Sequence, residues 1–173
     1  MRIIAGSKKG HRIEAPKGLT TRPTGDRVRE AAFNLIGPVE GADVLDLYAG
    51  SGAMGLEALS RGAASATFVE ADRAASRAIE RNLEKLRLTG ARVVCRDVLH
   101  ALASERRQYD LVLLDPPYEM TDFGAIARYL PGVLARDGLL VVETAARTEP
   151  ALPLRQRTTR RYGAARLTLF EHE

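Results

Sequence analysis

The sequence predicts an α/β fold, in which helices cover both faces of a sheet of mostly parallel strands. Short apolar runs recur from residue 43 onward, and segments with helical periodicity separate them. The runs are apolar at nearly every position, as expected of strands buried on both faces of a parallel sheet. Residues 155–171 instead alternate around Gly163, which indicates an antiparallel hairpin. We therefore expect a doubly wound, seven-stranded sheet with an antiparallel C-terminal strand.

A small basic extension precedes this repeating pattern. Residues 2–5 and 11–16 are read as two short strands around a Lys-Lys-Gly turn, and a helix is expected from Asp26 to Ile36. Thr24 is a candidate N-cap of that helix, and Gly37-Pro38 should end it. We treat residues 1–173 as one domain, in which residues 1–38 form the extension and residues 39–173 the core.

The core elements follow in regular alternation. Strands are expected at residues 43–48, 66–70, 91–97, 109–114, 138–144, 155–162 and 166–171. Helices are expected at residues 53–61, 74–88, 98–104 and 121–135. Pro131 should divide the last of these or begin a second short helix, because proline fits only the first turn of a helix.

The composition narrows the class of protein. The chain of 173 residues is 45% hydrophobic and 28% charged, which is ordinary for a soluble domain. It shows neither a signal-peptide core nor a run long enough to span a membrane, so we expect a cytoplasmic protein. A single cysteine, Cys95, which we read as a buried strand residue, excludes an intramolecular disulfide. Three scattered histidines predict no metal site.

Positive charge gathers at the two ends of the chain. Residues 1–30 hold eight Lys or Arg against three acids, and residues 147–166 hold six Arg against Glu149 alone. Such a distribution suits a polyanionic partner, since cation–phosphate contacts supply much of the affinity for nucleic acids. A solvated basic surface without a partner is the alternative that charge alone leaves open.

A glycine-rich turn follows the first core strand. Gly50, Gly52 and Gly55 have the G-x-G-x-x-G spacing, which lets a chain turn tightly and lets a ligand approach backbone N–H groups. With a strand before it and a helix after it, this turn predicts a Rossmann-like nucleotide site. A tight turn without a ligand is the alternative. No G-x-x-x-x-G-K-[S/T] pattern occurs, so a P-loop is not expected.

Three acids accompany this loop. Glu70 ends the second core strand, where a carboxylate can accept hydrogen bonds from both ribose hydroxyls of an adenosine ligand. Asp97 ends the third strand and could accept from an adenine amino group or cap the next helix; both readings stay open. Asp46 lies inside the first strand, and an acid there suggests a ligand with positive charge, such as S-adenosylmethionine.

The fourth strand ends in Asp115-Pro116-Pro117-Tyr118. An exocyclic amine on a base is a poor nucleophile, because its lone pair is delocalised into the ring. The Asp115 carboxylate and the Pro116 carbonyl could accept its two N–H bonds, orient the lone pair and stabilise the charge that develops on nitrogen. Pro116 and Pro117 would make these acceptors rigid, and Tyr118 could stack on a base removed from its helix. The pattern predicts methylation of a planar nitrogen.

Further motifs carry a resemblance to a known family. Residues 46–63 together with the D-P-P-Y motif resemble class I S-adenosylmethionine-dependent methyltransferases. Residues 22–34 and 161–171 narrow the resemblance further. Together with the motifs above, they make nearly the whole chain resemble the bacterial RsmD family of 16S ribosomal RNA guanine-N2 methyltransferases. Family members often carry Phe where this chain has Tyr118, a difference that keeps the capacity to stack.

The resemblance implies a set of site residues. The cofactor pocket would hold Asp46, Tyr48, Gly50, Ser51, Gly52, Glu70, Asp97 and Val98. The catalytic group would be Asp115, Pro116, Pro117 and Tyr118. The hypothesised RNA contacts are Lys8, Lys9, Arg12, Arg22, Arg27, Arg29, Arg160 and Arg161.

The resulting hypothesis is methyl transfer from S-adenosylmethionine to N2 of a guanine in 16S ribosomal RNA, within a 30S subunit or an assembly intermediate. No metal or membrane is expected to take part, and we take a monomer as the default. The rival methyltransferases are an adenine-N6 DNA enzyme, which normally needs a target-recognition insertion, and a glutamine-N enzyme, which typically has Asn in place of Asp115. A nicotinamide-dependent oxidoreductase and a non-catalytic nucleotide-binding module are rivals from other classes.

Overall fold

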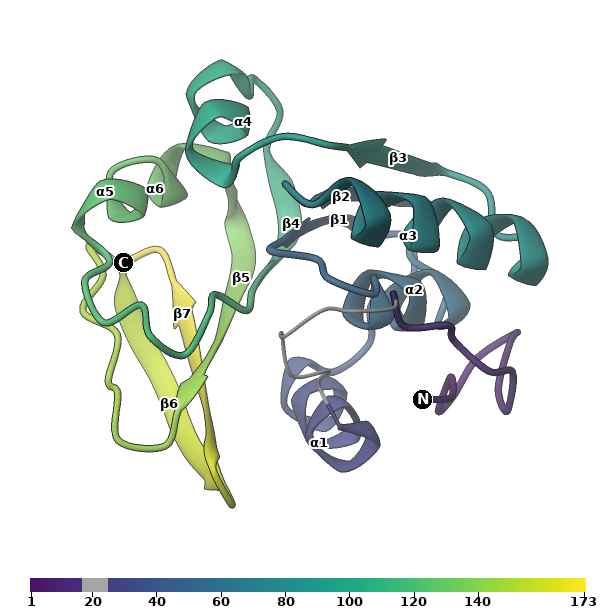
Figure 1. Ribbon diagram of the computed structural model, residues 1–173. Helices are drawn as coiled ribbons and strands as arrows, with labels where there is room; N and C mark the ends of the chain where they lie inside the picture. The colour runs from purple at the N-terminus through teal and green to yellow at the C-terminus, as the bar shows by residue number, and fades with distance from the viewer. Residues whose placement is uncertain (17–24) are drawn as a thin grey trace.

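The computed structural model describes residues 1–16 and 25–173. Its centre is one sheet of seven strands in the order β3-β2-β1-β4-β5-β7-β6 (Figure 1). The strands are β1 Asp43–Leu47, β2 Ser65–Val69, β3 Ala91–Val94, β4 Tyr109–Leu114, β5 Leu134–Ala145, β6 Arg155–Tyr162 and β7 Ala165–Glu171. The first five in spatial order pair in parallel, while β7 runs antiparallel to both of its neighbours. The predicted mostly parallel sheet with an antiparallel C-terminal strand is confirmed.

Helices cover both faces of the sheet, as a doubly wound fold requires (Figure 1). They are α1 Asp26–Ile36, α2 Ala53–Ser60, α3 Arg73–Leu86, α4 Val98–Ser104, α5 Gly124–Ala127 and α6 Leu130–Val133. One core cluster joins α1, α2 and α3 to one face, and a second joins α4, α5 and α6 to the other. Because side chains alternate along β1, Val44 packs in the first cluster and Leu45 in the second.

The N-terminal extension packs on the α1–α3 side of the sheet. A backbone bridge joins Arg2 to Arg12, and Ile3 and Ile13 lie buried in the first core cluster. The expected pair of strands is therefore reduced to one bridge and a few further backbone hydrogen bonds. The helix cap expected at Thr24 lies outside the described residues, and Gly25 is the N-cap position of α1.

Three core elements differ from expectation by more than two residues. β5 begins at Leu134 and not at residue 138. β3 ends at Val94 instead of continuing to Asp97, because β2, the strand it pairs with, ends at Val69 opposite Val94. Beyond this point the Arg96 N–H still donates to the Glu70 carbonyl at 3.2 Å. The prediction that Cys95 is a buried strand residue is consequently wrong, since Cys95 is exposed. The helix expected over residues 121–135 is two four-residue helices, and Pro131 lies in the first turn of the second, as its geometry requires.

Candidate functional site

The predicted site residues gather at the carboxyl ends of neighbouring parallel strands. β1 lies between β2 and β4, so the loops after these strands leave the same edge of the sheet. Backbone hydrogen bonds join the loops directly: Ala49 N–H donates to the Val69 carbonyl at 3.1 Å, and Asp115 N–H donates to the Leu47 carbonyl at 3.4 Å. The structure thus brings the glycine loop, the end of β2 and the D-P-P-Y motif into contact.

The three glycines of the loop meet three different requirements. Gly50 has φ +58° and faces open space, so a ligand could approach its backbone. Gly52 has φ +81° and is the N-cap of α2, and a Cβ there would lie 3.0 Å from Ile79. A Cβ on Gly55 would lie 2.4 Å from the Phe68 ring, so this glycine is what lets α2 pack against β2. The arrangement fits an adenosine-type cofactor at the loop.

Glu70 extends from the end of β2 to the glycine loop. Its Oε1 accepts from Gly50 N–H at 2.9 Å, and its Oε2 accepts from Asp72 N–H at 2.8 Å. Each carboxylate oxygen can accept more than one hydrogen bond, so these contacts leave acceptor capacity for ribose hydroxyls. The carboxylate is therefore fixed beside the glycine loop, and its contact with a ribose stays a prediction.

Asp46 lies beneath the loop and not on its surface. Its side chain faces α2, is 2% exposed, and accepts from Gly55 N–H at 3.0 Å. Burial raises the pKa of Asp46 to about 8; the Gly55 hydrogen bond opposes this shift, and the charge of Glu70 adds to it. At neutral pH a carboxyl group with this pKa is mostly protonated, so Asp46 supports the loop from below through a hydrogen bond, and its attraction of a cationic ligand stays a prediction.

Tyr48, Asp97 and Met120 connect the cofactor side to the D-P-P-Y side. Tyr48 has φ +57°, and its hydroxyl lies 3.8 Å from the Met120 sulfur. Burial raises the pKa of Tyr48, and the charge of Asp97 raises it further. Asp97 is the N-cap of α4, since its Oδ2 accepts from Leu99 N–H at 3.0 Å and from His100 N–H at 3.3 Å. The cap role is confirmed, and the adenine role stays a prediction.

Ser51 and Val98, the other predicted cofactor residues, differ in exposure. Ser51 is partly exposed within the glycine loop, and its carbonyl accepts from Asn82 Nδ2 at 3.3 Å. Val98 is only 2% exposed and packs in the second core cluster. A ligand contact by Val98 would therefore come from its backbone, since its side chain is part of the core.

The D-P-P-Y motif forms the loop that directly follows β4. Pro116 is buried, whereas Asp115 and Tyr118 are partly exposed at the edge. The Pro117 carbonyl accepts from Met120 N–H at 2.9 Å, which closes a turn over Tyr118 and Glu119. None of the described backbone amides donates to the Pro116 carbonyl. This carbonyl and the Asp115 carboxylate, on adjacent residues, are the two acceptors that the chemistry predicted above requires.

The predicted RNA contacts separate into exposed and buried cations. Exposed positions are Lys9, Arg12, Arg27, Arg160 and Arg161, with Lys8 partly exposed. Within the described part of the chain, none of these six forms an ion pair with an acid. Arg22 lies outside the described residues.

The prediction that Arg29 contacts RNA is wrong. Its side chain is 0% exposed, and its Nε donates to the buried carboxylate of Glu57 at 3.2 Å. Its Nη2 donates to Asp26 at 2.9 Å and to the Arg2 carbonyl. A guanidinium enclosed in this way cannot contact a phosphate, so Arg29 supports the fold.

Two buried polar residues were missed by the sequence analysis, Glu57 and Asn82. Glu57 is 0% exposed and accepts from Ile4 N–H, Ala5 N–H, Arg29 and Arg61. Asn82 is also 0% exposed and lies on the apolar face of α3. A polar residue at a position of apolar periodicity is the signal that could have identified both.

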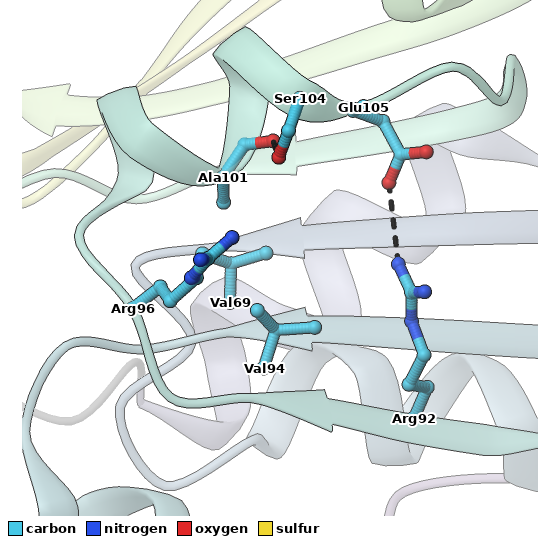
Figure 2. Close-up of a pocket in the computed structure, with 7 residues that line it drawn as sticks. All are labelled: Val69, Arg92, Val94, Arg96, Ala101, Ser104 and Glu105. Atoms are coloured by element: carbon cyan, nitrogen blue, oxygen red, sulfur yellow. Dashed lines mark hydrogen bonds and ion pairs between the residues drawn. The ribbon is translucent and has the colours of Figure 1, made fainter.

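A cavity of about 180 Å³ opens between β3 and α4 (Figure 2). Its lining residues are Val69, Arg92, Val94, Arg96, Ala101, Ser104 and Glu105. Arg92 donates to Glu105 across it at 3.3 Å. Burial favours the neutral acid of Glu105, yet hydrogen bonds from Arg107, Tyr109 and Arg106 and the charge of Arg92 outweigh it and lower its pKa. None of the predicted site residues lines this cavity, although Val69 and Arg96 adjoin the predicted cofactor residues Glu70 and Asp97 in sequence.

Within residues 1–16 and 25–173, none of the helices combines the length and the apolar character that a membrane span requires. No group of three or more His, Cys, Asp or Glu side chains in the same ranges could hold a metal ion.

Comparison with known proteins gives concordant matches. The family model described as Conserved hypothetical protein 95 matches residues 1–171. The Escherichia coli (strain K12) protein named Ribosomal RNA small subunit methyltransferase D is 42% identical over 147 residues, which cover 83% of this chain and 74% of that protein. YlbH of Bacillus subtilis (strain 168), assigned as an rRNA methyltransferase, is 42% identical over 150 residues, which cover 83% of this chain and 82% of that protein.

A solved structure agrees with these sequence matches. The Escherichia coli structure assigned as the methyltransferase yhhF superimposes with a TM-score of 0.90 at 38% identity. The match covers 100% of this chain and 98% of that one.

Proposed function

Because the chain belongs to the RsmD methyltransferase family, we propose that it transfers a methyl group from S-adenosylmethionine to N2 of a guanine in 16S ribosomal RNA. The substrate would be a small ribosomal subunit or one of its assembly intermediates. The name of the Escherichia coli relative, a small-subunit ribosomal RNA methyltransferase, supports this class of substrate.

One observation carries the proposal: the cofactor loop and the D-P-P-Y motif are joined at one edge of the sheet. Asp115 N–H donates to the carbonyl of Leu47, two residues before Ala49 and the glycine loop. The Tyr48 hydroxyl lies against Met120 on the other side of the motif. A methyl donor at Gly50 and an acceptor nitrogen at Asp115 would therefore be neighbours, as direct transfer requires.

The residues of the cofactor side fit S-adenosylmethionine. When bound, this cofactor supplies an electrophilic methyl group on a sulfonium. Gly50 faces open space, so the cofactor could approach the backbone there, and Glu70 offers oxygens to the ribose. Asp97 retains one oxygen, Oδ1, that its helix-cap hydrogen bonds do not use. These groups would bind and orient the cofactor.

The residues of the acceptor side would activate the amine. The Asp115 carboxylate and the Pro116 carbonyl each accept one N–H bond of the exocyclic amine, which directs its lone pair toward the methyl group. As charge develops on nitrogen, both acceptors stabilise it without rearranging, because Pro116 and Pro117 hold the loop rigid. The proton leaves after transfer, to Asp115 or to water. Tyr118 stacks on the flipped base.

The exposed cations would bind the RNA backbone. Residues 2–14, which the Arg2–Arg12 bridge closes, form what we call the N-terminal hairpin. Lys8, Lys9 and Arg12 lie on this hairpin, Arg27 on α1, and Arg160 and Arg161 on the edge strand β6. Arg160 and Arg161 donate only to backbone carbonyls among the described contacts, so their charges are not neutralised by acids. Phosphate groups would supply the missing negative charge.

The direct test is labelled methyl transfer to undermethylated small subunits, naked 16S ribosomal RNA and duplex DNA, measured side by side. We expect incorporation into subunits or their RNA and none into DNA. Incorporation into DNA alone would overturn the proposal in favour of an adenine-N6 enzyme, which uses the same motif.

A further inference from the structure

The side-chain amide of Asn82 lies between the glycine loop and the N-terminal hairpin. Its Oδ1 accepts from Glu14 N–H at 2.9 Å, and its Nδ2 donates to the Glu14 carbonyl at 3.0 Å and to the Ser51 carbonyl at 3.3 Å. Asn82 is 0% exposed. One buried side chain of α3 thus joins two segments, one of them 68 residues away in sequence and the other 31.

An amide is suited to this position because it has both donors and an acceptor. Asn82 uses both of its N–H groups and its oxygen in the three hydrogen bonds. A buried polar group that loses its partner has a large desolvation penalty, so displacing either Ser51 or Glu14 would be unfavourable. The glycine loop and the end of the hairpin are therefore fixed in position relative to each other.

A second tether holds the same hairpin but does not touch the glycine loop. Ser60, in α2, accepts from Lys8 N–H at 2.9 Å and donates to the Ala5 carbonyl at 2.7 Å through its hydroxyl. Ser7 N–H donates to the Ser60 carbonyl at 2.7 Å. Ser60 holds the hairpin in place, whereas Asn82 also links it to the glycine loop. Ser60 is therefore a matched control for Asn82.

We propose that Asn82 is a positioning residue that fixes the glycine loop and links it to the basic hairpin, so that S-adenosylmethionine and RNA raise each other's affinity. The hairpin carries Lys8, Lys9 and Arg12, so contact with phosphates would hold it, and with it Glu14, in one position. Because Asn82 bonds to both Glu14 and Ser51, this would also hold Ser51 in one position. Coupling between two binding sites is reciprocal, so either ligand can report it. The RNA part rests on the function proposed above.

The test is titration of S-adenosylmethionine into the protein, with and without undermethylated small ribosomal subunits as the RNA ligand, for the wild type, Asn82→Ala, Asn82→Asp and Ser60→Ala. We expect RNA to strengthen cofactor binding by about 5-fold in the wild type and in Ser60→Ala. We expect Asn82→Ala to weaken cofactor binding by about 10-fold and to abolish the effect of RNA, while kcat at saturating cofactor falls much less. Asn82→Asp, of the same size, should behave like Asn82→Ala, because it lacks both donors.

Several results would overturn the proposal. Equal losses of cofactor affinity in Asn82→Ala and Ser60→Ala would mean that Asn82 only stabilises the fold. An RNA effect that survives in both Asn82 variants would exclude it as the link. A wild type that methylates RNA but binds the cofactor equally well without RNA would also refute the coupling. A wild type that never methylates RNA would instead refute the proposed function, while the comparison of cofactor affinities still decides the positioning role.

Discussion

The carboxylate of Glu70 accepts a hydrogen bond from Gly50 N–H at 2.9 Å, which joins the end of β2 to the glycine loop that follows β1. The loop is thus held by an acid that follows the neighbouring strand. We predict that the same acid offers its remaining lone pairs to a ribose. Glu70 would then shape the cofactor site in two ways, and its removal should affect both.

Replacing Glu70 by Gln should weaken S-adenosylmethionine binding by about 10- to 100-fold, as expected when hydrogen bonds to a charged acceptor are lost. Calorimetric titration measures the affinity directly. Glu80→Gln, at an exposed position of the following helix α3, is the matched control and should leave the affinity unchanged. Equal affinities in Glu70→Gln and the wild type would remove Glu70 from the cofactor site.

Tyr118 is expected to act through its ring and not through its hydroxyl. Tyr118→Phe should keep methyl transfer within a few-fold of the wild type, whereas Tyr118→Ala should lose about 10- to 100-fold in kcat/KM for RNA, since base stacking contributes about 1–3 kcal/mol. Steady-state kinetics with subunits as the substrate measures both. A comparable loss in Tyr118→Phe would show that the hydroxyl, and not stacking, is required.

Asp46 should make the stability of the protein depend on pH. Its pKa is raised from 3.8 to about 8 in the folded state, so the folded chain keeps a proton that the unfolded chain releases above pH 4. The stabilisation that this proton gives the folded state is therefore fully present below pH 4. The free energy of unfolding then decreases as the pH rises to about 8, by at most about 1.4 kcal/mol per pH unit.

The pH effect is measured by urea unfolding of the wild type and Asp46→Asn between pH 5 and pH 8.5. The asparagine keeps an acceptor for Gly55 N–H but does not titrate. The stability of Asp46→Asn relative to the wild type should increase with pH. A difference that stays constant over this range would show that Asp46 is ionised beneath the loop.

The buried Arg29–Glu57 ion pair should contribute strongly to the stability of the folded protein. Glu57→Ala leaves Arg29 without its buried counter-ion and leaves Ile4 and Ala5 N–H without their acceptor. We expect the free energy of unfolding to fall by about 3–5 kcal/mol. Asp26→Ala, which removes the half-exposed partner of the same guanidinium, should lower it by about 1 kcal/mol or less. Denaturant unfolding of both variants decides whether the buried contact dominates.

The fold could be predicted because its signals are local. The apolar run before Gly50 and the helical pattern after Gly55 identify a strand, turn and helix without knowledge of the rest of the chain. Asp115 could be placed near the glycine loop because the ends of parallel strands share one edge. Pro131 likewise marks the start of α6, as proline is confined to the first turn of a helix.

The errors concern contacts between distant residues. A solvated arginine and an arginine paired in the interior look alike in sequence, and the partner of Arg29 is Glu57, 28 residues away. The bonds from Asn82 to Glu14 and Ser51 depend in the same way on how α3 packs. Cys95 was misplaced because nothing in its neighbourhood indicates that β3 is an edge strand that ends at Val94.

The most direct test of the central claim is identification of the methylated base. Undermethylated small subunits are incubated with S-adenosylmethionine and either the wild type or Asp115→Asn, and their RNA is digested to nucleosides for mass spectrometry. We predict N2-methylguanosine with the wild type and a loss of at least about 100-fold with Asp115→Asn, which should still bind the cofactor. N6-methyladenosine in its place, or wild-type activity in Asp115→Asn, would contradict the account.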